Sequence, residues 1–161
     1  MIVREFIQKF MIDDIGRLVD SHPFHSFVLM SIGIEFLGKC LRAGDWDDPN
    51  RNATEDFNNA ISELYSFTKY RSIDGLYDKL RCGLAHLSVP KNGIKLDREG
   101  NDISSSPIIL GCREMYEDFK SACNEVLEDK EGKVKKDLTK DYLVIDNTTT
   151  GSTVISYKEK T

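Results

Sequence analysis

Apolar residues recur every three or four positions along most of this chain, which is the spacing of amphipathic helices. The predicted helix from Pro23 to about Arg42 is apolar on almost every side, as expected for a helix at the centre of a bundle. Other helices are predicted over residues 2–19, 52–70, 73–87 and 112–129. The pattern therefore predicts a mainly all-α fold, an up-and-down bundle of about five helices.

Residues at the ends of these segments, and two glycines within one of them, support this interpretation. Pro23 suits the first position of a helix, where its missing N–H would have no partner. Asn52 with Glu55 three residues later resembles a capping box at the start of the third helix. Gly33 and Gly38 lower the propensity of the second helix, so they predict that a neighbouring helix comes close there.

The pattern changes after the fourth helix. Short β-type runs, Ile94 to Leu96 and Ile108 to Leu110, are separated by turn residues, which predicts a small hairpin or an irregular loop. Residues 141–157 predict two strands around a polar turn, a C-terminal hairpin. The lysine-rich stretch before it is predicted to be solvated. We therefore predict a helical bundle over residues 1–130 and a lysine-rich linker with a C-terminal β or tail segment over 131–161.

Composition narrows the class of protein. A chain of 161 residues that is 40% hydrophobic can bury the core of one domain. Its net charge of -5 excludes a broad basic surface, so any contact with nucleic acid must be local. The four cysteines show no C-x-x-C spacing, which disfavours zinc and disulfides and indicates reduced thiols in the cytoplasm. No signal peptide or uninterrupted membrane span is visible, so we expect a soluble protein with no membrane partner.

The segment Leu76 to Pro90, "LYDKLRCGLAHLSVP", carries the candidate chemistry. If it is a regular helix, Arg81 and His86 lie about 140° apart on opposite rims of the apolar stripe. Between them, Cys82 and Ala85 form a shallow strip of small residues on which another helix can rest, from this chain or from a second copy. In a two-fold dimer, two arginines and two histidines would converge on one cleft. The stripe predicted to face the core comprises Ile73, Leu76, Tyr77, Leu80, Leu84 and Leu87.

These residues resemble the signature of the HEPN family of small helical bundles, an arginine followed after four to six residues by a histidine near a helix end. Here it is "RCGLAH", Arg81 to His86, and the similarity, including the very apolar second helix, covers about Ile2 to Asp129. The resemblance implies metal-independent cleavage of RNA at a homodimer interface, with no cofactor. His86 would act as general base or acid, and Arg81 would hold the scissile phosphate. Toxins of this type are commonly paired with a neutralising partner protein.

A second interpretation stays open, in which the motif is a structural remnant in a non-catalytic HEPN-like module that dimerises or binds a protein or nucleotide. Catalytic members usually carry a polar residue after the arginine, whereas this chain has Cys82. A helix dipole also favours cations in the last turns, so Arg81 and His86 need no function to be there.

Three further positions bear on the candidate site. Glu35 in the apolar second helix either faces Arg81 or Arg71 across the bundle, ordering the site, or lies at an exposed edge. Asp78 is an alternative partner for Arg81. Trp46 is interpreted as a lid over the edge of the core rather than as a platform for base stacking.

Overall fold

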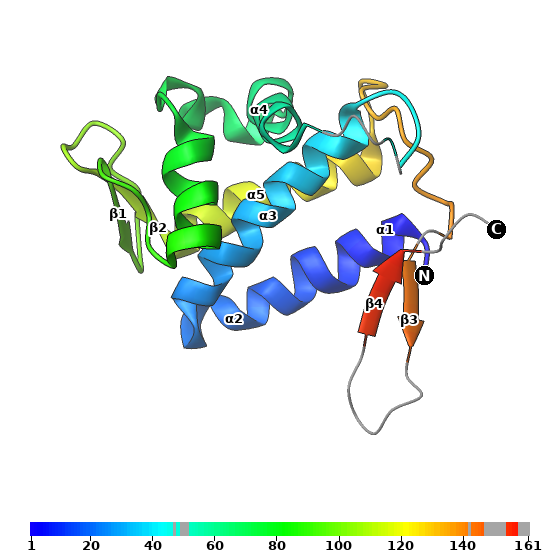
Figure 1. The fold of residues 1–161 in the computed structure, drawn as a ribbon, viewed down its shortest axis with the longest axis horizontal. Coiled ribbons are helices and arrows are strands. Elements are labelled where there is room, and N and C mark those ends of the chain that lie inside the picture. Colours follow the sequence, from blue (N-terminus) through cyan, green and yellow to red (C-terminus); the bar gives the residue numbers. More distant parts are fainter. Residues whose placement is uncertain (47, 49–51, 142, 147–153, 158–161) are drawn as a thin grey trace.

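The computed structural model describes residues 1–46, 48, 52–141, 143–146 and 154–157. The described part is mainly helical, as predicted (Figure 1). A continuous first helix is made of α1, the π-helix η1 and α2, and ends at Ser21. Pro23 then starts α3 at its first turn, as the sequence indicated. The helices are α1 (Val3–Phe6), η1 (Ile7–Asp14), α2 (Ile15–Ser21), α3 (Pro23–Leu41), α4 (Ala53–Glu63), the 3₁₀-helix η2 (Tyr65–Ser72), the π-helix η3 (Tyr77–Leu87) and α5 (Cys112–Glu128).

Helix α3 lies at the centre of the helical body, between the first helix and α4 and α5 (Figure 1). Its two glycines mark close approaches, as predicted. A Cβ at Gly38 would overlap the backbone carbonyl oxygen of Asp56 in α4, and one at Gly33 would lie 2.5 Å from the Phe119 ring in α5. Among the described helices, α3 is long and apolar enough to cross a membrane, yet 61% of its most apolar window is buried within the molecule. This burial is typical of the core helix of a soluble protein.

The third helix is shorter than predicted. Helix α4 begins after Asn52, whose side chain accepts a hydrogen bond from the Glu55 N–H, as the capping box indicated. It ends at Glu63 because Leu64 is extended, with φ −84° and ψ 127°. The chain then winds again as η2, so the predicted continuation of one helix to residue 70 is wrong.

A carboxylate from another helix explains this break. Glu125 of α5 accepts hydrogen bonds from the backbone N–H groups of Tyr65 and Ser66, both at 2.8 Å, and from the Ser66 hydroxyl. These N–H groups lie at the start of η2, where they have no partner within their own helix. The tertiary contact therefore stabilises a second helix start at a place where the local sequence favours continuation.

The two β-type runs after η3 form strands, but their pairing is not that of a hairpin. Strands β1 (Ile94–Asp97) and β2 (Ile108–Gly111) are parallel, with Ile94 opposite Ile108. The connection returns along the far edge of β2, where Asp102 and Ile109 exchange two backbone hydrogen bonds of 2.9 Å. The connection therefore occupies one edge of β2 and runs opposite to it, while β1 pairs with the other edge and runs in the same direction as β2.

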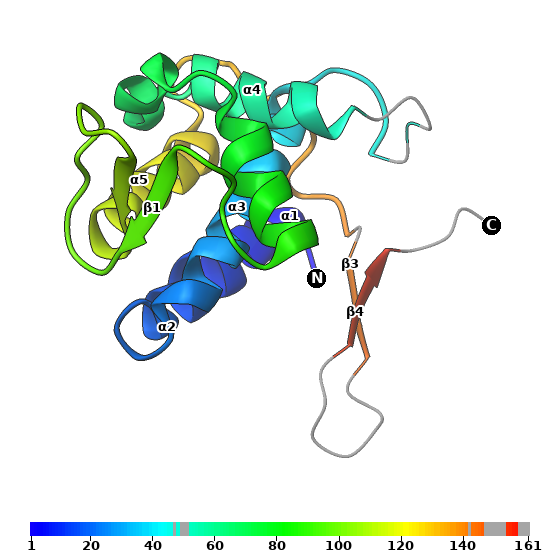
Figure 2. The ribbon, with the colours of Figure 1, turned by 60° about the vertical axis from the view of Figure 1, so that its left-hand side comes forward.

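The two strands of the predicted C-terminal hairpin are confirmed. Strands β3 (Leu143–Asp146) and β4 (Val154–Tyr157) pair antiparallel, with Leu143 opposite Tyr157. They project away from the helical body in both views (Figures 1 and 2). The polar turn predicted over residues 148–153 lies outside the described residues.

The lysine-rich stretch before this hairpin is packed, so the prediction of a solvated linker is wrong for its second half. Lys136 and Leu138 are each only 6% exposed. The backbone N–H groups of Lys135 and Lys136 both donate to the Cys40 carbonyl at the end of α3. The Leu138 carbonyl accepts from the Arg4 N–H at 3.0 Å, so this segment also closes against the first helix.

Trp46 is a lid over the core edge, as predicted. Its ring is 3% exposed and stacks on Phe36 at 5.5 Å. The ammonium groups of Lys39 and Lys136 lie 5.5 and 5.7 Å from the ring, within range of a cation–π interaction. Lys136 also donates to the carbonyls of Gly44 and Asp45, which joins the C-terminal segment to the loop after α3.

Candidate functional site

The residues around the motif give η3 an unusual winding. The helix follows Gly75, whose φ of +64° suits glycine, and it ends at Ser88 in the left-handed conformation. Beyond Ser88 the chain folds back, and the Lys91 N–H donates to the Lys79 carbonyl at 2.8 Å. In an α-helix that carbonyl would accept a hydrogen bond from the N–H of Gly83. The returning chain lies so close that a Cβ at Gly83 would be 2.8 Å from the Lys91 nitrogen, so only glycine fits.

This winding changes the relation between Arg81 and His86. The regular wheel puts them on opposite rims of the core stripe, but η3 is a π-helix, in which hydrogen bonds run from residue i to i+5. Five residues then make little more than one turn, so Arg81 and His86 lie nearer to one face than predicted. Arg81 is partly buried, whereas His86 is exposed on the following turn.

A buried carboxylate fixes the arginine. The Arg81 Nε donates to the Glu35 Oε2 of α3 at 2.8 Å, and the two side chains are 18% and 2% exposed. This is one of the two partners that the sequence indicated for Glu35. Arg71, the other, donates instead to the carbonyls of Ile61 and Leu64. The ion pair restricts the guanidinium. Within the described residues its terminal nitrogens make no hydrogen bond, so they can contact an anion.

The other two residues predicted to support the site, Asp78 and Cys82, make contacts of their own. Asp78 pairs with Lys91 at 2.5 Å, so it is not the partner of Arg81. Cys82 is partly buried and lies beside Tyr77, which precedes it by one turn of the π-helix. Burial raises the pKa of the Tyr77 hydroxyl, hydrogen bonding to Thr54 lowers it, and contact with Cys82 raises it further. Cys82 is therefore a neighbour of the site that packs against an aromatic side chain.

Of the strip of small residues on η3, Ala85 faces outward whereas Cys82 is partly buried. Ala85 is exposed, and the apolar surface continues past it because Leu87 and Val89 are 58% and 56% exposed. The prediction that Leu87 faces the core is wrong, since the chain turns away at Ser88 one residue later. On α3, Leu29 and Ile32 are also more than a third exposed. Apolar side chains thus stand uncovered on both helices that carry the Glu35–Arg81 pair.

These groups can bind an anion and move a proton. A guanidinium is suited to phosphate, and an imidazole can donate or accept a proton. Within the described residues, no group of three His, Cys, Asp or Glu side chains is placed to hold a metal ion. No protein-family model, no curated protein and no solved structure matches this chain. Its function must therefore be inferred from the site itself.

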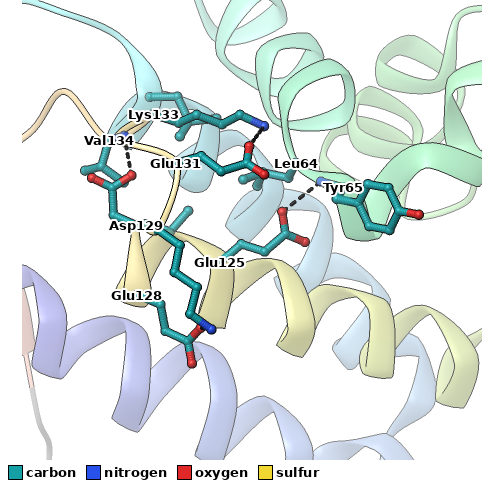
Figure 3. Close-up of a pocket in the computed structure, with 11 residues that line it drawn as sticks. Leu64, Tyr65, Glu125, Glu128, Asp129, Glu131, Lys133 and Val134 are labelled. Carbon is teal, nitrogen blue, oxygen red and sulfur yellow. Dashed lines mark hydrogen bonds and ion pairs between the residues drawn. The ribbon is translucent and has the colours of Figure 1, made fainter.

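One of the cavities lies away from this site, at the C-terminal end of α5 (Figure 3). It has a volume of about 300 Å³, an apolar floor and a rim of charged side chains. Most of these charges already have partners: Glu125 caps η2, Glu128 pairs with Lys130, and Glu131 pairs with Lys133. The cavity is thus lined by groups that hold the fold.

Another cavity lies beside the candidate site. It is a cleft of about 520 Å³ between α4 and the chain that leads into η3, and it includes Tyr77 and Asp78. Sequence reasoning missed it because its two walls come from segments that the pattern assigned to separate helices. It also missed the Arg42–Asp56 ion pair of 3.0 Å, in which Asp56 is fully buried. Gly38, which faces Asp56, was the one signal for that contact.

Proposed function

We propose that this protein is a HEPN-like, metal-independent endoribonuclease of the defence or toxin type that acts in the cytoplasm as a homodimer. The observation that carries the proposal is the Arg81 guanidinium held at 2.8 Å by buried Glu35, with exposed His86 on the next turn of the same π-helix. An up-and-down helical bundle and a neutralising partner protein are part of the same proposal. The uncovered small and apolar residues of η3 and α3 support a contact with a second copy.

The proposed chemistry uses a ribose hydroxyl of the RNA itself. His86 of one protomer takes the proton of the 2′-hydroxyl, whose oxygen then bonds to the adjacent phosphorus. The bond from phosphorus to the 5′-oxygen breaks, and His86 of the second protomer, in its protonated form, gives that oxygen a proton. The products are a 2′,3′-cyclic phosphate and a 5′-hydroxyl. Arg81 stabilises the extra negative charge of the pentacoordinate transition state.

The test is to incubate RNA with wild type, Arg81→Lys, Arg81→Ala and His86→Ala in the presence of EDTA, and to analyse the product ends. We expect wild type to leave cyclic phosphates and His86→Ala to lose at least 100-fold in rate, as is typical for a general acid or base. Arg81→Lys keeps the charge but not the fork, so its rate falls as well. Equal cleavage by all four proteins would refute the enzymatic proposal.

A second candidate function is a non-catalytic HEPN-like module that binds a protein or a nucleotide. Two observations favour it: Cys82 stands where catalytic members usually have a polar residue, and Glu35 offsets the charge of Arg81. A wild-type protein that is dimeric by light scattering and leaves RNA intact would support this alternative.

A further inference from the structure

The cleft beside η3 has two walls of different character. One wall is a face of α4 that carries Thr54, Asn58, Ile61 and Ser62, which are spaced three or four residues apart except for the last pair. The other is the turn from Ile73 to Asp78, which bends at Gly75. The buried side chains of Ile61, Ile73 and Leu76 form an apolar floor. A cleft of about 520 Å³ with an apolar floor and polar rims has the size and character of a small-molecule site.

The polar rim of this cleft carries two carboxylates, Asp74 and Asp78, beside hydroxyl and amide groups and one guanidinium. Within the described residues, the Asp74 carboxylate and the Asn58 amide make no hydrogen bond, so both can contact a ligand. The cation that lines the cleft, Arg71, already donates its Nε and one terminal nitrogen to backbone carbonyls. Asp78 adds a second carboxylate at the rim, paired with Lys91. The Asp74 carboxylate can therefore accept a hydrogen bond from an N–H group of a ligand.

The cleft is also adjacent to the proposed cleavage site. Tyr77, which lines the cleft, precedes Arg81 by four residues, a rise of about 6 Å along the axis of an α-helix and less in a π-helix. The Arg81 charge lowers the pKa of the Tyr77 hydroxyl, although burial is the larger effect and raises it. Tyr77 thus joins the cleft to the turn of η3 that carries Arg81.

We propose that this cleft is a base-binding subsite that selects a nucleobase with an exocyclic amino group next to the phosphate on Arg81. This inference rests on the proposed function for its biological meaning. The base lies over Ile61 and Leu76, and its amino group donates to Asp74 and to the Asn58 carbonyl. Cytosine, adenine and guanine present such a donor, whereas uracil presents a carbonyl oxygen that faces the Asp74 carboxylate unfavourably.

The experiment compares cytidine with uridine, which differ in the group at position 4. Each nucleoside is titrated into the 15N-labelled full chain, and amide shifts of residues 54–62 and 73–78 are followed. We expect cytidine to bind about tenfold more tightly than uridine, the discrimination of one good hydrogen-bonded pair. Asp74→Asn should abolish this ratio, while Glu117→Gln, which removes an exposed carboxylate on α5, should preserve it. Equal affinities in wild type, or shifts confined to other residues, would overturn the proposal.

Failure of this inference and failure of the proposed function are distinguishable. Nucleosides carry no phosphate and are not cleaved, so their binding is independent of catalysis. An active ribonuclease that cleaves cytidine-rich and uridine-rich RNA equally and binds neither nucleoside would refute the subsite alone. A cytidine-selective cleft in a protein that leaves RNA intact would refute the enzyme alone and favour the nucleotide-binding module.

Discussion

The Glu35–Arg81 pair makes a sharp prediction for stability as well as for chemistry. The two side chains are 2% and 18% exposed and lie 2.8 Å apart. Removing one member of a buried ion pair costs about 3–5 kcal/mol, because the other charge stays in a low dielectric. About a fifth of the Arg81 side chain reaches solvent, so water can enter once it is removed. We therefore expect Arg81→Ala to lower the free energy of unfolding by about 3 kcal/mol.

A double-mutant cycle separates this pair from the rest of the packing. Glu35→Gln retains a carbonyl acceptor and removes the charge, so we expect a loss of about 1–2 kcal/mol. In the double variant Glu35→Gln/Arg81→Ala, no buried carboxylate is left without its guanidinium. The double variant should therefore lose less free energy of unfolding than the two single variants together, by about 1–3 kcal/mol.

The assay is urea unfolding followed by far-UV circular dichroism at one protein concentration. With a slope of about 1–3 kcal/mol/M, a loss of about 3 kcal/mol moves the midpoint by roughly 1–3 M. Arg17→Ala removes an exposed pair with Asp14 and serves as the control, with an expected change within about 0.5 kcal/mol. If Arg81→Ala unfolds like the control, or if the single losses add without coupling, the reasoning from burial is wrong.

Three further predictions test the packing. Gly38→Ala should lower the free energy of unfolding by about 2–3 kcal/mol, measured by thermal unfolding, since its Cβ overlaps the Asp56 backbone and the gain of about 1 kcal/mol in helix propensity is smaller. Gly33→Ala meets the Phe119 side chain instead of a backbone, so its loss should be smaller, and equal losses would contradict this. Glu125→Gln should speed hydrogen exchange at Tyr65 and Ser66 because the anionic cap is lost, whereas Glu128→Gln should leave both amides unchanged. The Asn101 N–H and then Lys69 lower the pKa of Glu114 in the folded protein. The stability that Glu114 contributes is therefore complete above its unfolded pKa of about 4.3 and is lost as pH falls through the lower folded pKa. The urea midpoints of wild type and Glu114→Gln should converge on acidification, and a constant difference from pH 7 to pH 3 would refute this prediction.

Local patterns were sufficient for the helices that present one apolar face to the core. The start of α3 at Pro23, the cap at Asn52 and the fifth helix from Cys112 follow from neighbouring residues alone. The break at Leu64 does not, because the group that stabilises it is Glu125, some sixty residues further along the chain. Sequence periodicity carries no information on such a partner.

The candidate site shows the same division. The sequence left Glu35 either paired with Arg81 or Arg71 or at an exposed edge, because an ionised carboxylate in the most apolar helix needs a cation or water. The structure buries it against Arg81. The relation of Arg81 to His86 could not be predicted, because it depends on the π winding of η3 and on the Lys91 N–H that reaches the Lys79 carbonyl. The burial of Lys136 was equally hidden, since a run of lysines is usually solvated.

The order in which this chain is made gives the contacts of residues 135–140 a further meaning. They close against Cys40, Val3 and Arg4, so the earliest and latest parts of the helical body complete each other. A ribosome makes Val3 well before Lys140, and domains fold as units once their residues have emerged. Until then, the end of α3 and the first helix lack these partners. The nascent protein therefore completes this packing only after residues 135–140 have been translated.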